Sequence, residues 1–252
     1  MIIDTHCHVD LYQNPLAIAK ECERLKITTI CMTNLPSHFE AGYPHLRGFT
    51  WVKLALGFHP LMVEQYNREL PAFKKSLHKT NFIGEIGLDF SREGKATKDL
   101  QIKCLRFVLQ AISDRPRFVS LHSRAAESTV LELLEEFNVR RAVFHWYSGS
   151  LANLDRAIKQ GHYFSINPAM TQSKRSLAII ARIPKEHLLT ETDGPFLEYQ
   201  GRPARPGDVR MVLKQLSTIW HLLPDEVELQ IISNYNSLIN ALGVNTSSGT
   251  KQ

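Results

Sequence analysis

Residues 1–10, MIIDTHCHVD, show the pattern that decides the fold: an apolar, β-branched run that ends in two histidines one residue apart. If this run is a β-strand, side chains alternate between its faces, and Asp4, His6 and His8 share one face. Two imidazoles side by side can bind one divalent ion, and we expect Asp4 to orient them from behind. Two partly exposed histidines on an edge strand are the alternative interpretation, so the rest of the chain has to decide.

Similar runs recur along the chain, separated by segments in which apolar residues have helical spacing. One such segment, Leu151–Ile158, is followed by Gly161 as a predicted helix C-cap. The alternation predicts a single α/β domain of the (β/α)8 TIM-barrel type over residues 1–243, with a doubly wound open sheet as the alternative. The polar end, residues 244–252, is predicted to be a disordered tail. The eight predicted strands are Ile2–Val9, Thr28–Thr33, Val52–Gly57, Phe82–Leu88, Phe118–Leu121, Ala142–Tyr147, Tyr163–Ile166 and Leu188–Glu191.

The composition restricts the class of protein. At 252 residues and 43% hydrophobic, with no run approaching the roughly 18 apolar residues of a membrane span, the chain is expected to be globular, without a membrane segment. No secretory leader is visible, so we expect a cytoplasmic protein with its four cysteines reduced. The net charge of +5 and the pI near 9.0 favour an anionic partner.

Polar side chains follow the predicted strands at the end where a barrel of this class builds its active site. Six of them are potential ligands, which is more than one tetrahedral ion needs, and they predict two divalent ions. Glu85 is the predicted bridge because a carboxylate can divide its two oxygens between ions. Imidazole and carboxylate donors fit Zn²⁺ or Mn²⁺, and Mg²⁺ stays open. The six predicted ligands are His6, His8, Glu85, His122, His145 and Asp193, and His59, Asn34 and Asn167 end further strands.

Six local sequences, taken in order, closely resemble the motifs of the TatD family of metal-dependent deoxyribonucleases: IIDTHCHVD, LGFHP, GEIGLD, SLHSRAAE, FHWYSGS and TETDGPFLE. The resemblance extends from Ile2 to about Asn236. It implies a distorted TIM barrel that hydrolyses phosphodiester bonds in DNA with two metal ions, typically as an exonuclease. It also implies that His59 is a substrate-binding or outer group and that Arg124 contacts phosphate.

The same resemblance divides the ligands between the ions. His6, His8, Glu85 and Asp193 would hold one ion, and Glu85, His122 and His145 the other. Where family members commonly read H-C-F-T/S-G, this chain reads HWYSG at residues 145–149, and it has DGPFL and GRPARPGD near its last strand. These departures affect the shape of the substrate pocket and suggest a divergent branch, such as the QatD-type members associated with phage defence.

The predicted chemistry is hydrolysis without a covalent intermediate. The two ions lower the pKa of a bridging water and neutralise charge on the phosphate, while Asp193 orients that water and accepts its proton. Three basic loops could surround the mouth, with Arg92, Lys95 and Lys98, then Lys174 and Arg175, then Arg202, Arg205 and Arg210. Four aromatic residues are either stacking surfaces for a terminal base or parts of the core: Phe90, Trp146, Tyr147 and Phe196.

Two other functions compete with DNA hydrolysis. The same barrel could act as a small-molecule amidohydrolase, although many such enzymes bridge their ions with a carboxylated lysine where this chain has Glu85. A catalytically silent subunit of a larger complex is the other alternative, and the intact ligand set argues against it. Protein partners, metal identity, cleavage polarity and the choice between DNA and RNA stay open.

Overall fold

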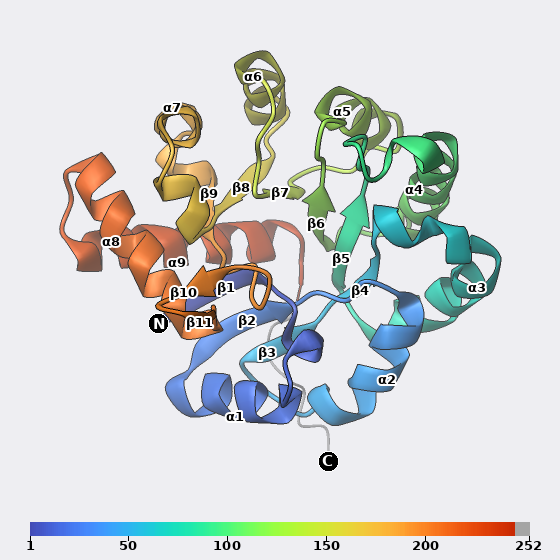
Figure 1. Cartoon of the computed structure of the whole chain (residues 1–252), viewed down its shortest axis with the longest axis horizontal. Coiled ribbons are helices and arrows are strands. Elements are labelled where there is room, and N and C mark those ends of the chain that lie inside the picture. Colours follow the sequence, from blue (N-terminus) through green and yellow to red (C-terminus); the bar gives the residue numbers. More distant parts are fainter. Residues whose placement is uncertain (245–252) are drawn as a thin grey trace.

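The computed structural model describes residues 1–244, and within them parallel strands alternate with helices around a closed barrel (Figure 1). Strands β1 to β3 form one parallel sheet and β4 to β9 form another, each in sequence order. The strands are β1 (Ile2–Cys7), β2 (Ile27–Cys31), β3 (Val52–Leu54), β4 (Leu56–Phe58), β5 (Phe82–Gly87), β6 (Phe118–His122), β7 (Val143–His145), β8 (Tyr163–Ile166) and β9 (Leu188–Thr190).

The barrel closes between its first and last strands, which lie side by side. The Asp193 amide donates to the His6 carbonyl over 3.0 Å, and the His8 amide donates to the Gly194 carbonyl over 2.7 Å. The Thr5 hydroxyl also donates to the Thr190 carbonyl over 3.0 Å. An open doubly wound sheet would leave these two edges apart, so the TIM-barrel-like prediction is confirmed.

The predicted strand Val52–Gly57 is two strands in the structure, and it carries the chain from one sheet to the other. β3 pairs with β2, whereas β4 pairs with β5. Between them lies Ala55, whose amide donates to the Cys31 carbonyl and whose carbonyl accepts from the Thr33 hydroxyl, both over 2.8 Å. The sequence pattern missed this bend because Ala55 continues the apolar run and is fully buried.

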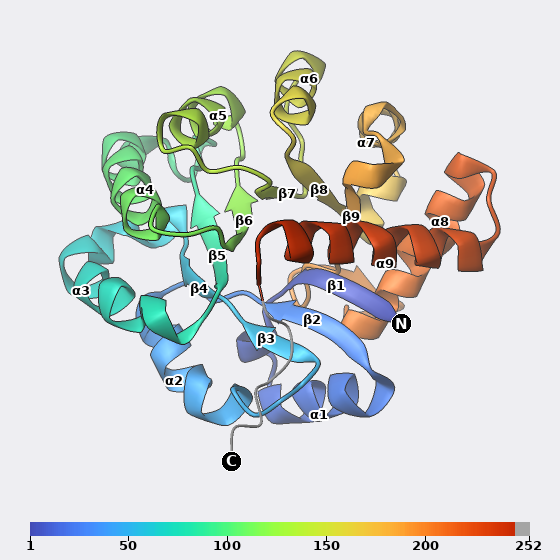
Figure 2. The ribbon, with the colours of Figure 1, turned by 180° about the vertical axis from the view of Figure 1, so that it is seen from behind.

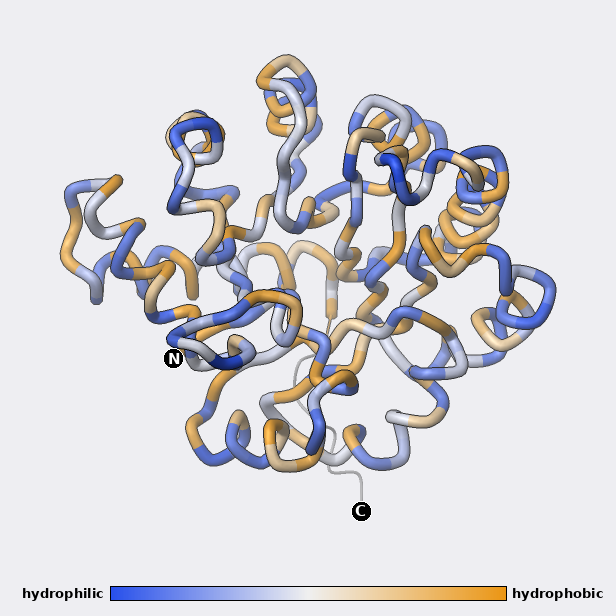
Figure 3. Tube along the Cα trace, in the orientation of Figure 1, coloured by the Kyte–Doolittle hydropathy of each residue, from blue (hydrophilic) through white to orange (hydrophobic). Residues whose placement is uncertain are grey.

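Helices cover the outside of the barrel, as the two opposite views show (Figures 1 and 2). Hydrophobic residues gather along the strands and on parts of the helices, whose other residues are hydrophilic (Figure 3). Gly161 ends the sixth helix region with φ +79°, as a C-cap glycine does. The outer helices are α1 (Pro15–Leu25), α2 (Pro36–Leu46), α3 (Tyr66–Ser76), α4 (Lys98–Ile112), α5 (Glu127–Glu136), α6 (Leu151–Lys159) and α7 (Lys174–Arg182).

Two further helices, α8 (Val209–Trp220) and α9 (Pro224–Ala241), complete the domain. α9 crosses the face of the barrel nearest the viewer in Figure 2, beside the starts of the strands. Its buried Asn234 donates to the Lys185 and Leu188 carbonyls over 2.6 and 2.7 Å, at the start of β9. α9 therefore covers the end of the barrel opposite the strand ends that carry the histidines. A short hairpin that the sequence did not predict, β10 (Glu198–Tyr199) and β11 (Arg202–Pro203), precedes α8.

The end of the described chain is packed against the domain. Val244 is buried, whereas residues 245–252 of the predicted tail lie outside the described residues. All four cysteines are buried free thiols. Among the described helices, none combines the length and the apolar character that crossing a membrane requires.

Gly57 lies where the two sheets meet, and we predict that Gly57→Ala destabilises the fold. A Cβ atom at this position would lie 1.7 Å from the Thr33 carbonyl oxygen and 2.7 Å from the Glu85 amide nitrogen, so backbone must move. We expect a loss of about 1–3 kcal/mol or more in the free energy of unfolding, measured by urea titration. Gly48→Ala is the control because nothing lies within 4 Å of its added Cβ. Equal urea midpoints for the two variants would contradict this account.

Candidate metal centre

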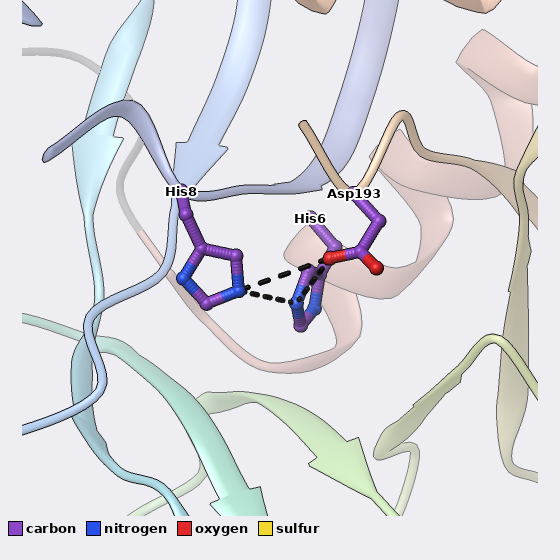
Figure 4. A group of neighbouring side chains, drawn as sticks. All are labelled: His6, His8 and Asp193. Atoms are coloured by element: carbon purple, nitrogen blue, oxygen red, sulfur yellow. Dashed lines mark hydrogen bonds and ion pairs between the residues drawn. The ribbon is translucent and has the colours of Figure 1, made fainter. Parts of the chain in front are cut away.

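The two histidines that open the chain lie together at the end of β1, beside Asp193 from the loop after β9 (Figure 4). The two Nε2 atoms of His6 and His8 are 3.3 Å apart. Asp193 Oδ1 lies 3.7 Å from His6 Nε2 and 3.8 Å from His8 Nε2. All three side chains are buried. Barrel closure creates this group, because the amide of Asp193 is hydrogen-bonded to the carbonyl of His6.

Glu85 on β5 lies between this group and a second set of histidines. Its Oε2 is 3.4 Å from His8 Nε2 and 3.7 Å from His6 Nε2. Its Oε1 is 2.7 Å from His122 Nδ1 and 3.0 Å from His145 Nε2. The two carboxylate oxygens therefore face two different sets of nitrogen atoms.

The structure brings all six predicted ligands to one place and adds a seventh residue to the cluster. His59 Nε2 lies 3.6 Å from Glu85 Oε1, and its Nδ1 accepts a hydrogen bond from the Leu61 amide. Three groups of donor atoms are close enough together to hold a cation: His6, His8 and Asp193; His6, Glu85 and His145; and His59, Glu85 and His122.

The donor set fits a divalent cation. The imidazole nitrogens and carboxylate oxygens point at one another, and where a proton joins them, as between His122 and Glu85, a divalent cation can take its place. Nitrogen and oxygen donors without sulfur suit Zn²⁺ and Mn²⁺, and the two carboxylates suit harder ions. The Nε2 atoms of His6 and His8 face each other over 3.3 Å, so both can turn a lone pair to one cation.

Burial and mutual charge shift the pKa values of the cluster. Burial raises the pKa of Asp193 to about 7, against the lowering effect of His145 and His8. Burial would also raise the pKa of Glu85, but the histidines around it outweigh that effect and hold the pKa well below its usual range. The pKa of His6 is well below its usual range because of burial and the nearby His145. Glu85 is therefore the permanent anion of the cluster, and Asp193 can exchange a proton near neutral pH.

The expected role of Asp4 behind the histidine rings is wrong. Its carboxylate accepts from the His6 amide over 3.2 Å and from the Thr192 amide over 3.1 Å, so it ties the ends of β1 and β9 together. Residues two apart on a strand project in parallel, which leaves Asp4 deeper in the barrel than the rings. The His6 ring is instead held by Ser120 on β6, whose Oγ is 2.8 Å from Nδ1.

Asp89 is a functional candidate that sequence reasoning missed. Its Oδ2 lies 2.8 Å from His122 Nε2, while the other ring nitrogen of His122 faces Glu85. A carboxylate on the far nitrogen fixes the orientation of a ligand histidine and makes it a better donor. The Asp89 amide is itself held by Gln101 Oε1 over 2.8 Å. The sequence did contain a signal for this residue: Asp89 is the last residue of the motif GEIGLD and directly follows the predicted strand Phe82–Leu88.

Glu191 is a second missed residue, and it lies behind His145. Its Oε1 is 3.5 Å from His145 Nδ1 and accepts from the Trp146 amide over 3.1 Å and from Asn167 Nδ2 over 3.0 Å. Ser165 Oγ donates to the other oxygen. Glu191 is fully buried. The sequence signal for Glu191 was its position as the last residue of the predicted strand Leu188–Glu191. Asn167 lies at the end of its strand, as predicted.

The cluster opens into a cavity of about 650 Å³ at the carboxyl ends of the strands. Arg124 is the basic residue in its lining, and it lies 3.8 Å from Glu93 with more than half of each side chain exposed. None of the residues of the predicted basic ring lines the cavity, so the ring stays a prediction for the surface around the mouth. Several of them contact neighbouring groups: Lys98 lies over the Phe90 ring, Arg202 pairs with Asp208 and Arg205 pairs with Glu21. Arg175 donates to the carbonyl of Ser148, which lines the cavity.

The four aromatic residues near the site separate into two pairs. Tyr147 belongs to the core, with 1% of its surface exposed, and Phe90 lies outside the cavity lining under the Lys98 ammonium. Trp146 and Phe196 line the cavity and are 37% and 57% exposed. The sequence could not separate these pairs because all four follow or lie near strand ends.

Comparison with known proteins gives a consistent set of relatives. The family model described as TatD related DNase matches residues 3–240. The uncharacterized metal-dependent hydrolase YabD of Bacillus subtilis is 25% identical over 245 residues, which is 90% of this chain and 94% of the relative. The deoxyribonuclease Tat-D of Schizosaccharomyces pombe is 31% identical over 136 residues, 53% of this chain and 43% of the relative.

A solved structure agrees with these relatives. The crystal structure of YjjV, a TatD homolog from Escherichia coli, superposes with a TM-score of 0.83 at 26% identity and covers 95% of this chain and 98% of its own. YjjV is itself called an uncharacterized metal-dependent hydrolase. The similarity therefore extends over the whole barrel, including the strand ends that carry the clustered histidines.

We predict that Glu191→Gln weakens metal binding about 10- to 100-fold, because the loss of charge next to His145 removes the support behind a ligand ring. Isothermal titration with Zn²⁺ and Mn²⁺ measures the effect. Glu186→Gln is the matched control, since Glu186 is exposed and distant from the cluster in the fold. Unchanged affinity in Glu191→Gln would show that this carboxylate does not support the ligands.

Metal binding should release a proton from Asp193 below neutral pH. With a pKa of about 7, its carboxyl is mostly protonated at about pH 6 and must lose that proton to coordinate an ion. We expect Asp193→Asn to release about one proton fewer than the wild type at that pH and the same number near pH 8.5. Titration calorimetry in buffers of different ionisation enthalpy counts these protons. Equal proton release at the lower pH would rule out Asp193 as the titrating ligand.

Proposed function

We propose that this chain, which belongs to the family of TatD-related DNases and is a metal-dependent hydrolase, removes nucleotides from the ends of DNA strands through a two-metal centre. The observation that carries this proposal is the division of the Glu85 oxygens between two sets of histidines. A single ion would need only one of these sets. A carboxylate that serves both is the arrangement expected of a bridge.

In this proposal the ligands divide as the distances suggest. His6, His8 and Asp193 with Glu85 Oε2 would hold one divalent ion. Glu85 Oε1 with His122 and His145, whose nitrogens lie 2.7 and 3.0 Å from it, would hold the other. His59 lies beside the second group and either adds a ligand or contacts substrate. When bound, the two ions acidify a water molecule and neutralise charge on the phosphate. The metal can be Zn²⁺, Mn²⁺ or Mg²⁺.

Asp193 is the proposed general base. It lies at the edge of the cavity beside His6 and His8, so its carboxylate is in position to accept a proton from water. The amide of Asp193 is bound to the His6 carbonyl, which keeps the carboxylate beside the histidines while it gains or loses the proton. Glu85 cannot take this role, since the surrounding histidines keep it ionised.

The cavity supports a substrate end in preference to a long stretch of nucleic acid. A volume of about 650 Å³ is in the range of sites that enclose one small ligand. Arg124 at the lining is the proposed phosphate contact, and its exposed pair with Glu93 is weak enough to exchange for a phosphate oxygen. A backbone held by one arginine and the bound ions suits a scissile phosphate near a strand terminus.

The test is a cleavage time course on end-labelled single- and double-stranded DNA and RNA, with Mg²⁺, Mn²⁺ or Zn²⁺ added to metal-free protein. We expect stepwise shortening of DNA that depends on metal and falls by at least about 10³-fold in Glu85→Ala, because both ions lose a ligand. Glu186→Gln serves again as the control for folding and purity. The label position gives the polarity of cleavage.

The outcomes separate the alternatives. Shortening of RNA alone would change the substrate class but keep the reaction. Hydrolysis of small amides or esters without any cleavage of nucleic acid would identify an amidohydrolase on the same barrel. A folded, metal-loaded protein that cleaves none of these substrates would favour a catalytically silent subunit.

A further inference from the structure

Two exposed aromatic side chains stand at the mouth of the metal cavity, and each is attached to the loop of a candidate ligand. We propose that Trp146 and Phe196 form a stacking site for one unpaired terminal nucleobase, which selects single-stranded DNA ends. This inference rests on the proposed phosphodiesterase function and adds to it the part of the substrate that the protein recognises.

Trp146 is placed by the same group that supports a ligand. It directly follows His145, and its amide donates to Glu191 Oε1 over 3.1 Å. Its backbone has φ +40°, a conformation that side chains other than glycine rarely adopt, and the bond to Glu191 holds it there. The ring nevertheless keeps 37% of its surface exposed at the cavity. A constrained backbone therefore holds an exposed aromatic ring next to the candidate metal ligands.

Phe196 approaches the cavity from the loop after Asp193. Its amide donates to the Asp193 carbonyl over 3.0 Å, and its ring packs edge-on against the His8 ring with centroids 5.0 Å apart. More than half of the ring, 57%, is exposed. The T-shaped contact with His8 therefore leaves most of the phenyl ring available to a ligand.

The remaining lining explains why a base is the expected occupant. Leu61 and Met62 add further apolar surface to the cavity, and Leu61 is also exposed. Large apolar side chains gathered around one opening mark a binding surface more often than scattered ones do. The lining contains one arginine, so little affinity can come from a row of phosphate contacts along a duplex. Stacking of bases on aromatic rings supplies affinity without many charges and needs a base that is not already paired.

The test compares phosphodiesters that share a leaving group and differ in the base. We would measure kcat/KM for the 5′- and 3′-p-nitrophenyl phosphate diesters of thymidine and for methyl p-nitrophenyl phosphate, which has no base. The wild type should prefer the better thymidine diester by roughly tenfold or more. Trp146→Ala should reduce that ratio toward one, Phe196→Ala should reduce it in part, and Trp146→Phe should restore most of it.

Controls separate stacking from a loss of folding. Leu229→Ala removes an apolar side chain of α9 that is even more exposed than the two aromatic rings, and it should leave every rate unchanged. Metal content and the urea midpoint are measured for each variant. A preference for thymidine that survives Trp146→Ala and Phe196→Ala would overturn the proposal, as would a wild type that treats both kinds of diester alike.

A binding measurement distinguishes failure of this inference from failure of the proposed function. Fluorescence anisotropy of a labelled oligo(dT), compared with the same strand carrying abasic sites at both ends, needs no turnover. Tighter binding of the intact strand by the wild type but not by Trp146→Ala supports stacking even if no diester is hydrolysed, and the hydrolase proposal then fails alone. Equal binding of the two strands contradicts stacking, and preferential binding of a blunt duplex contradicts the choice of single-stranded ends.

Discussion

The buried carboxylate of Glu85 is the constraint on which the rest of the site depends. An ionised carboxylate with 3% of its surface exposed is unfavourable unless opposite charges or hydrogen bonds compensate for the lost water. Here His122 and His145 lie 2.7 and 3.0 Å from one oxygen, and His8 lies 3.4 Å from the other. Both oxygens of Glu85 are thus compensated by histidine nitrogens, so nitrogen donors lie next to each oxygen. Two cations that share one carboxylate would require the same arrangement.

Further polar groups extend this compensation away from the cavity. Asp89 holds the far nitrogen of His122, Glu191 lies behind His145, and Ser120 holds His6. Each contact restricts a ring that would otherwise rotate about two side-chain bonds, so the ligands are arranged before any ion arrives. Two of them also accept from backbone amides after the strands, Glu191 from Trp146 and Asp89 from Ser91, and therefore connect the positions of the rings to the shape of the mouth.

The floor and the wall of the cavity differ in polarity. The floor is polar and almost fully buried, and it carries the candidate metal ligands. The wall includes Trp146, Phe196 and Leu61, which remain exposed although they are large and apolar. A substrate with one anionic group and one flat apolar group would match both parts, which is the physical basis for inferring a nucleotide at a strand end.

The sequence by itself determined the barrel, most strand positions and the six candidate ligands that cluster in the structure. Strand periodicity and a shared strand-end position are local patterns that can be read without coordinates. It did not reveal the break at Ala55, the role of Asp4, the supporting groups Asp89 and Glu191, or which aromatics are exposed. These depend on contacts between segments far apart in the chain, such as the 2.8 Å approach of Asp89 to His122. Only the tertiary structure decided them, since the direction and burial of a side chain are set by what packs against it from other strands.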